Sequence, residues 1–157
     1  MTTMNNNRPA LAAFINSDIN KELNSKPEFM LPKKVRQLVY DKCGGHCAYC
    51  GKEIAYKDMQ VDHIIPLLRN FPDWQIEMGG WTRGNDDIDN LLPSCRSCNF
   101  RKGTCDLEDF RKQVKAQCDS LCKTFQGRMS LSYGLIVKVY KPIVFYFEKL
   151  NNQKEEI

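Results

Sequence analysis

Two short cysteine motifs constrain the fold of this chain more than any other feature. Cys47 and Cys50 form one CxxC pair, and Cys95 and Cys98 form a second. A turn of this length aims two thiolates at one ion, so two such turns supply the four ligands of a tetrahedral zinc site. A redox motif is the alternative, but it needs only one CxxC in a βαβ setting. We therefore expect the pairs to hold one structural Zn²⁺.

The rest of the composition indicates an intracellular protein. The polar N-terminus lacks the charged and apolar regions of a secretory signal, and no apolar run approaches the ~20 residues of a membrane span. Eight cysteines in a reducing compartment call for metal binding, catalysis or burial instead of disulfides. Cys118 and Cys122, one turn apart on an expected helix, are interpreted as buried thiols. A net charge of +4 permits a polyanionic partner without requiring one.

Periodicity and turn residues predict an α+β fold built from short elements. We expect helices from Pro32 to Gly44 and from Asp106 to Phe125, the second ended by Gly127. A short strand is expected over 59–65, a second apolar piece at Leu91-Leu92, a long loop over 69–88, and at least one strand within 135–139 and 143–147. The chain divides into an N-terminal extension (1–32), a central domain (33–127), and a C-terminal extension (128–157) that packs on the domain and has a disordered polar end.

Hydrolytic chemistry is expected between the two cysteine pairs. Asp62 and His63 place a carboxylate beside an imidazole within the expected strand. Adjacent strand residues point to opposite faces, so the two side chains need a bend to serve one site, and Pro66 makes that bend plausible. Asn90 and Asn99 lie near the second cysteine pair. Carboxylate and amide oxygens suit Mg²⁺ or Mn²⁺, and histidine accepts a proton near neutral pH, so the set indicates a metal-assisted hydrolase.

The order of these motifs resembles that of the HNH endonucleases, also called ββα-metal or His-Me finger nucleases, with an added four-cysteine zinc site. The motifs that carry the resemblance are Cys47-x2-Cys50, Val61-Asp62-His63-Ile64-Ile65-Pro66, Gly79-Gly80, Asp89-Asn90-Leu91, Cys95-x2-Cys98-Asn99 and Lys102-Gly103. They span about half of the chain, and an ordered match of six motifs is far more specific than any one of them.

The resemblance implies two antiparallel strands and a helix around one catalytic divalent ion, Mg²⁺ or Mn²⁺. It assigns His63 as the general base and Asn90 as the residue that holds the strand loop and orients His63. Asp62 and Asn99 become the ligands of the catalytic ion. Many family members have histidine where this chain has Asn99, and an amide oxygen still coordinates Mg²⁺.

Double-stranded DNA is the partner that the resemblance implies. The expected phosphate contacts are Arg101, Lys102, Arg96, Lys34 and Arg36. The gap between Pro66 and Asp89 is longer than usual for the family, with Arg69 to Met78 as the expected insertion. Its Phe71, Trp74, Trp81 and Arg83 would touch DNA, or the aromatic residues would pack the insertion on the domain. Because one active site cuts one strand, a double-strand break requires either a homodimer or two successive binding events by one protein molecule. Whether the product is a nick or a break stays open, as does a phage, mobile-element, restriction or defence setting. The alternative function is a zinc-stapled nucleic-acid-binding module without catalysis.

Overall fold

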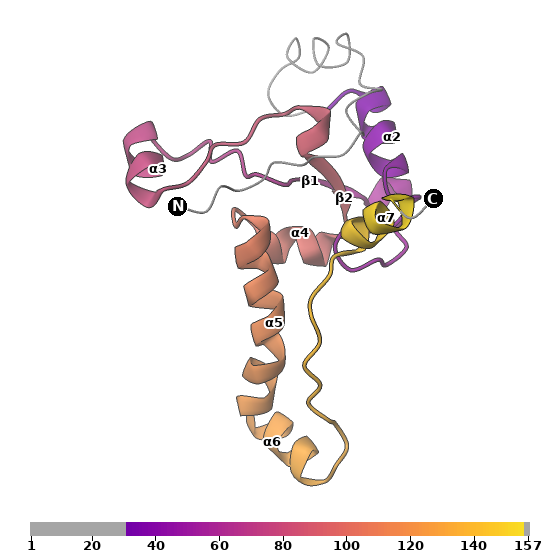
Figure 1. Cartoon of the computed structure of the whole chain (residues 1–157), viewed down its shortest axis with the longest axis vertical. Coiled ribbons are helices and arrows are strands. Elements are labelled where there is room, and N and C mark those ends of the chain that lie inside the picture. The colour runs from indigo at the N-terminus through magenta and orange to yellow at the C-terminus, as the bar shows by residue number, and fades with distance from the viewer. Residues whose placement is uncertain (1–30, 156–157) are drawn as a thin grey trace.

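The computed structural model describes residues 31–155, so residues 1–30 of the expected N-terminal extension and the last two residues of the chain lie outside the described part. The elements in chain order are α2 (Lys33–Asp41), β1 (Gln60–His63), α3 (Asp73–Gly79), β2 (Leu91–Ser94), α4 (Arg96–Lys102), α5 (Leu107–Lys123), α6 (Phe125–Ser132) and α7 (Tyr146–Glu155), with 3-10 turns at Tyr56–Asp58 and Ile88–Asn90 (Figure 1). The predicted α+β class is confirmed.

A two-stranded antiparallel ribbon lies at the centre of the fold. In its register Asp62 pairs with Leu92 and His63 pairs with Leu91. Every residue of β2 is buried, and α4, which starts directly after β2, packs against β1. The predicted strand over 59–65 is therefore present in its middle four residues. The order of the elements around the site is β1, β2 and α4.

Helix α2 covers β2 with one apolar face. Val35 and Val39, four residues apart, are both buried in the main core cluster, as expected for an amphipathic helix. Between them, Arg36 turns its guanidinium toward the chain before β1 and donates to the carbonyls of Met59 (2.5 Å) and Tyr56 (3.3 Å). The helix thereby supports the start of β1.

The expectation of a continuous loop over 69–88 is wrong, because the segment contains helix α3. Pro72 precedes the helix, Asp73 lies in its first turn, and Ile76 is its buried residue. Gly80 ends it in the left-handed conformation (φ 64°), which favours glycine. Figure 1 shows α3 at the tip of a projection away from the ribbon.

The long second helix is also shorter than expected. Asp106 caps α5, as predicted, by accepting from the backbone N–H of Asp109 (2.8 Å). Gly127 does not end this helix. Thr124 caps a new helix, α6, by accepting from the N–H of Gly127 (3.0 Å). Gly127 is needed for close packing, because a Cβ there would lie 2.0 Å from the Leu121 carbonyl oxygen.

The expected C-terminal strand is absent from the described residues. Residues 135–145 run back beside α5 as extended chain without a strand partner (Figure 1), and α7 then begins at Tyr146. Phe145 is buried, stacks on Phe110 at 5.4 Å and meets the edge of Tyr49 at 5.3 Å. These apolar residues are therefore placed by aromatic packing on the core, not by a strand ladder.

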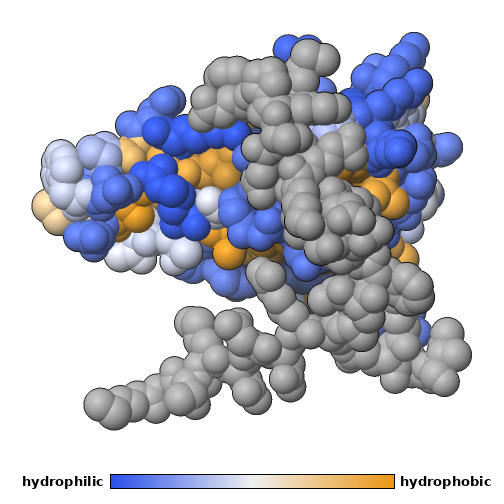
Figure 2. Space-filling view, turned by 90° about the horizontal axis from the view of Figure 1, so that it is seen from above, coloured by the Kyte–Doolittle hydropathy of each residue, from blue (hydrophilic) through white to orange (hydrophobic). Residues whose placement is uncertain are grey.

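In the coloured part of Figure 2, blue hydrophilic residues predominate, with smaller orange hydrophobic areas between them. Several large apolar side chains of α5, α6 and the returning segment are exposed, among them Leu121, Phe125, Tyr133 and Leu135. The expectation that the thiols of Cys118 and Cys122 are buried holds only in part, because both are half-buried. Within the described part of the chain, no helix has the length and apolar character needed to cross a membrane.

Candidate active site

The two cysteine pairs come together in one cluster. The ligand atoms of Cys47, Cys50, Cys95 and Cys98 all lie within 4.8 Å of one another, and the Cys50 and Cys95 sulfurs are 3.9 Å apart. Four sulfurs at about 2.3 Å from one zinc ion would lie about 3.8 Å from each other. The donor set and its spacing therefore fit a tetrahedral metal site.

Local backbone geometry explains why these residues converge. Gly45 (φ 76°) and Gly51 (φ 73°) adopt left-handed conformations on either side of the first pair, which residues with a Cβ rarely do. The sulfur of Cys95 caps α4 by accepting from the N–H of Cys98 (3.5 Å). The N–H of Ala48 donates to the carbonyl of Pro93 (2.8 Å), which ties one cysteine turn to the other.

Within the cluster, the thiolate form that binds metals is favoured at Cys47, whereas burial raises the pKa of Cys50 and the hydrogen bond with Cys47 raises the pKa of Cys98. Hydrogen bonding from the Cys98 thiol and from nearby backbone amides lowers the pKa of Cys47 to about 4, although burial acts in the opposite direction. His46 takes no part in the cluster. Its Nδ1 lies 2.8 Å from the Gly44 carbonyl and its ring packs against Tyr146.

Asp62 and His63 line the same hollow, which has a volume of about 260 Å³. Residues 66–71 and the Gly103–Thr104 turn after α4 form its other walls. Asp62 is buried and His63 is half-buried. The two adjacent residues therefore reach one site.

The Asp62 carboxylate is held by two buried donors that no sequence pattern marks for this role. The Tyr49 hydroxyl donates to Oδ2, and the Lys102 Nζ lies 3.1 Å from the same oxygen. Burial and the nearby Asp62 charge raise the pKa of Tyr49 well above its usual range, so the phenol stays protonated as a donor. Lys102 also donates to the His63 carbonyl (2.6 Å). One ammonium group thus fixes two consecutive residues of β1.

His63 is oriented by a carboxylate that sequence reasoning missed. Its Nε2 lies 2.8 Å from Oδ1 of Asp86, whose Oδ2 accepts from Arg69 at 3.3 Å. An ionised carboxylate only accepts hydrogen bonds, so Nε2 must carry the hydrogen. The neutral imidazole then keeps its lone pair on Nδ1. No motif marked Asp86, which lies in the long segment before β2.

The side chain of Asn90 holds the segment that follows His63 in place. Its Nδ2 donates to the carbonyls of Ile65 (3.0 Å) and Asn85 (2.8 Å), and its Oδ1 accepts from the N–H of Ile65 (2.8 Å). Gly84 fits beside these bonds because it has no Cβ, which would lie 2.0 Å from the Ile65 oxygen. Asn90 thus bridges both chain segments that flank the site.

Asn99 lies one helical turn before Lys102 on α4, so the two residues share a helix face. Its side chain is half-buried. Because Lys102 reaches Asp62, this face of α4 is the one turned toward β1. A carboxylate and an amide oxygen are the hard ligands that a Mg²⁺ or Mn²⁺ ion takes in proteins, so the donor types of Asp62 and Asn99 suit a divalent ion, although Asn99 is not among the residues that line the hollow of Asp62 and His63.

The expected phosphate contacts fall into two groups. Lys34, Arg96 and Arg101 are exposed. Lys102 is completely buried against Asp62, and Arg36 is bound to two carbonyls under α2. Contrary to expectation, the charged groups of Lys102 and Arg36 bind partners inside the protein instead of facing a DNA backbone.

The Lys102–Asp62 pair gives a prediction about stability. Lys102→Met leaves the buried carboxylate without its ionic partner, which should cost about 3–5 kcal/mol in the free energy of unfolding. Adding Asp62→Asn removes the uncompensated charge and should recover part of that loss. Urea unfolding of both variants measures this. Arg101→Met, at an exposed neighbour, is the control and should change stability by less than about 0.5 kcal/mol. A Lys102→Met chain as stable as the control would contradict the assignment.

Comparison with known proteins agrees with this geometry. Residues 47–104, which contain both cysteine pairs and the Asp62–His63 site, match the family model described as HNH endonuclease. Among solved structures, the crystal structure of the Type II-C Cas9 enzyme from Actinomyces naeslundii matches 62% of this chain and 10% of that chain, at 24% identity and a TM-score of 0.43. The chain thus spans about a tenth of that enzyme's length. No curated protein matches the chain. The match to the HNH endonuclease model covers less than half of the chain, and it spans the segment from the first cysteine turn to the turn after α4, which builds the site.

Proposed function

We propose that the chain is a metal-dependent endonuclease that hydrolyses phosphodiester bonds of double-stranded DNA. The observation that carries the proposal is the hollow shared by Asp62 and His63, with Asp86 bound to Nε2 of the imidazole. This arrangement leaves Nδ1 as the basic nitrogen of His63, in a hollow that the buried Asp62 also lines. A binding module without catalysis has no need for such a pair.

In the proposed reaction, His63 accepts a proton from water at Nδ1, and the water oxygen attacks the scissile phosphorus in line. The bond to the 3′ oxygen breaks as the new bond to phosphorus forms, and the leaving oxygen takes a proton from solvent. Asp62 and Asn99 would hold the catalytic ion, Mg²⁺ or Mn²⁺. When bound, such an ion stabilises negative charge on the phosphate and the leaving oxygen.

The other parts of the proposal concern folding and DNA binding. The four-cysteine cluster would hold Zn²⁺ as a structural ion, since its four sulfur ligands leave no open position for water or substrate. Lys34, Arg96 and Arg101 would contact backbone phosphates, which orient a duplex but carry no sequence information. The protein would act inside the cell, where its substrate and a reducing environment are found.

A plasmid assay tests the proposed activity. Purified protein with Mg²⁺ should convert supercoiled plasmid to nicked or linear DNA, and EDTA should stop the reaction until Mg²⁺ is restored in excess. His63→Ala should lower the rate by about 10²- to 10⁴-fold, because the general base is lost, while DNA binding and the melting temperature stay near wild type. Nicking at the wild-type rate by this variant would show that His63 is not the base. A wild-type protein that binds DNA but never cuts it would favour the non-catalytic module.

The orienting carboxylate can be tested separately. Asp86→Asn replaces an acceptor with an amide that can donate to Nε2, which favours the wrong imidazole tautomer. We expect a loss in cleavage rate of at least about tenfold. Asp87→Asn is the matched control, because the Asp87 side chain bonds Asn85 and not His63. Equal rates for the two variants would remove Asp86 from the site.

Zinc removal tests the structural role of the cluster. Cys47→Ser should abolish stoichiometric zinc and lower the melting temperature by about 10 °C or more, since metal binding in such sites contributes directly to folding. Cys118→Ser, on α5 outside the cluster, should retain both. Metal analysis and thermal unfolding followed by circular dichroism give the two readouts. A zinc-free chain that melts at the wild-type temperature would contradict this role.

A further inference from the structure

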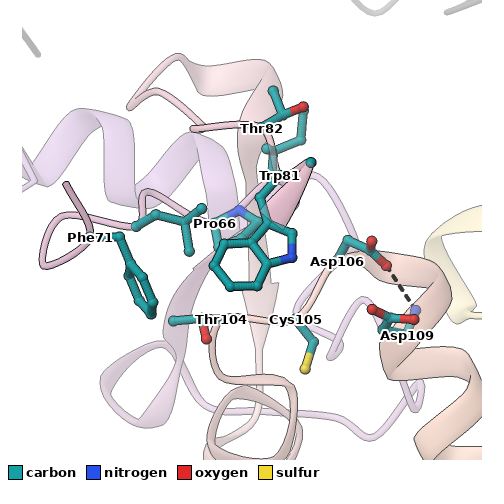
Figure 3. A pocket seen from close by; sticks show the side chains of 11 residues that line it. Pro66, Phe71, Trp81, Thr82, Thr104, Cys105, Asp106 and Asp109 are labelled. Atoms are coloured by element: carbon teal, nitrogen blue, oxygen red, sulfur yellow. Dashed lines mark hydrogen bonds between the residues drawn. The ribbon is translucent and has the colours of Figure 1, made fainter. Parts of the chain in front are cut away.

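A second hollow adjoins the one that contains Asp62 and His63. It has a volume of about 430 Å³ and lies between the insertion and the turn that leads into α5 (Figure 3). Pro66, Leu68, Phe71 and Thr104 line both hollows, so the two are neighbours that share a wall. We call the second hollow the Trp81 pocket, because Figure 3 shows the indole ring of Trp81 at its centre.

The indole of Trp81 is held in one orientation by its neighbours. A Cβ on Gly79 would lie 2.7–2.9 Å from three atoms of the indole, so the Gly79 backbone packs closely over the ring. Phe71 meets the indole in an edge-to-face contact at 5.6 Å, beside the ring in Figure 3. Trp81 nevertheless remains 52% exposed. Trp81 is thus held in place and still accessible where it lines the pocket.

The loop that carries Phe71 is fixed from behind by Arg83. Its guanidinium donates to the carbonyls of Leu68 and Phe71 (both 2.7 Å) and to Asp73 (2.8 Å). Arg83 is thus occupied inside the insertion. These bonds hold the aromatic wall in place before any ligand arrives, which lowers the ordering cost of binding.

The charges of the pocket exclude phosphate and favour a neutral ring. Among the residues that the structure describes, no lysine, arginine or histidine lines it, whereas Asp106 and Asp109 do. In each of these carboxylates, Oδ1 already accepts a hydrogen bond within the protein. Oδ1 of Asp106 accepts from the N–H of Asp109, and Oδ1 of Asp109 accepts from Nζ of Lys112. Their Oδ2 atoms have no described hydrogen bond and can accept from N–H groups of a ligand. A flat heteroaromatic ring with an amino group satisfies both the indole face and these oxygens.

We infer that the Trp81 pocket takes one unstacked, amino-bearing nucleobase of the cleaved strand, next to the scissile phosphate. The inference rests on the proposed function, because the phosphate position is set by Asp62 and His63. Base–aromatic stacking contributes substantially to binding and requires no particular base, whereas the carboxylates disfavour thymine, which has no amino group. Trp81 is thus a substrate-positioning residue.

The two tryptophans of the chain allow a direct test. Trp74 is exposed on α3 and does not line the pocket, so Trp74→Phe leaves Trp81 as the single indole reporter. His63→Ala is added to keep the DNA intact. The probe is a duplex centred on a cut position mapped in the plasmid assay, compared with duplexes that carry an abasic site at either flanking nucleotide. The intact duplex should quench Trp81 fluorescence, and one of the abasic duplexes should not.

Variants of Trp81 supply the second readout. In the otherwise wild-type chain, Trp81→Ala should weaken DNA binding, followed by fluorescence anisotropy, by about 5- to 150-fold. Trp81→Phe should restore part of the affinity, because it keeps an aromatic plane. Trp74→Ala is the matched control and should bind as wild type. Melting temperatures of all three show whether folding is intact.

The outcomes separate the inference from the proposed function. Cleavage and DNA binding without quenching of Trp81, or equal losses in Trp81→Ala and Trp74→Ala, would overturn the inference and leave the nuclease proposal standing. A chain that neither binds nor cuts duplex DNA would overturn both. If both abasic duplexes quench Trp81 fluorescence as strongly as the intact duplex does, neither flanking base enters the pocket.

Discussion

The convergence of four cysteine sulfurs on one point is the constraint on which the rest of the structure depends. The first cysteine turn and the second come from distant parts of the chain, and the cluster places them within 4.8 Å. Between them, the Ala48–Pro93 hydrogen bond joins the first turn to β2. Helix α4 starts directly after Cys95, whose sulfur caps it. A metal ion bound here would fix the ribbon, the helix and the first turn relative to one another.

Because of this arrangement, the cluster also supports the candidate catalytic residues. Tyr49 lies between the two cysteines of the first turn, and Lys102 ends the helix that begins at the second. Both reach the same oxygen of Asp62. A buried carboxylate is costly without such partners, and with them its orientation is fixed. The cysteine cluster and the candidate catalytic residues therefore share one set of contacts, so a change that disrupts the cluster should also disturb Asp62 and His63.

The surroundings of the site are built by elements that the ββα core does not contain. Aromatic packing of Phe145 and Phe110 against Tyr49 brings the C-terminal segment onto the core behind the first cysteine turn. On the other side, the insertion contributes the walls of both hollows. The core would thus supply the chemistry, whereas the insertion shapes the space next to it.

The sequence by itself determined the features that depend on residues close together in the chain. The spacing of the cysteine pairs predicts the cluster, and Asp106 predicts the cap of α5. The order of motifs predicts the α+β core and the HNH family. Local patterns failed where tertiary contacts decide, as at 143–147, where aromatic packing places apolar residues that resemble a strand. Sequence patterns also did not predict which residues bind Asp62 and His63. Tyr49 and Asp62 are 13 residues apart, His63 and Asp86 are 23 apart, and Lys102 and His63 are 39 apart. Contacts over such separations exist only after the strands, α4 and the insertion have packed, so only the tertiary structure could decide which donors hold the carboxylate and which carboxylate orients the imidazole.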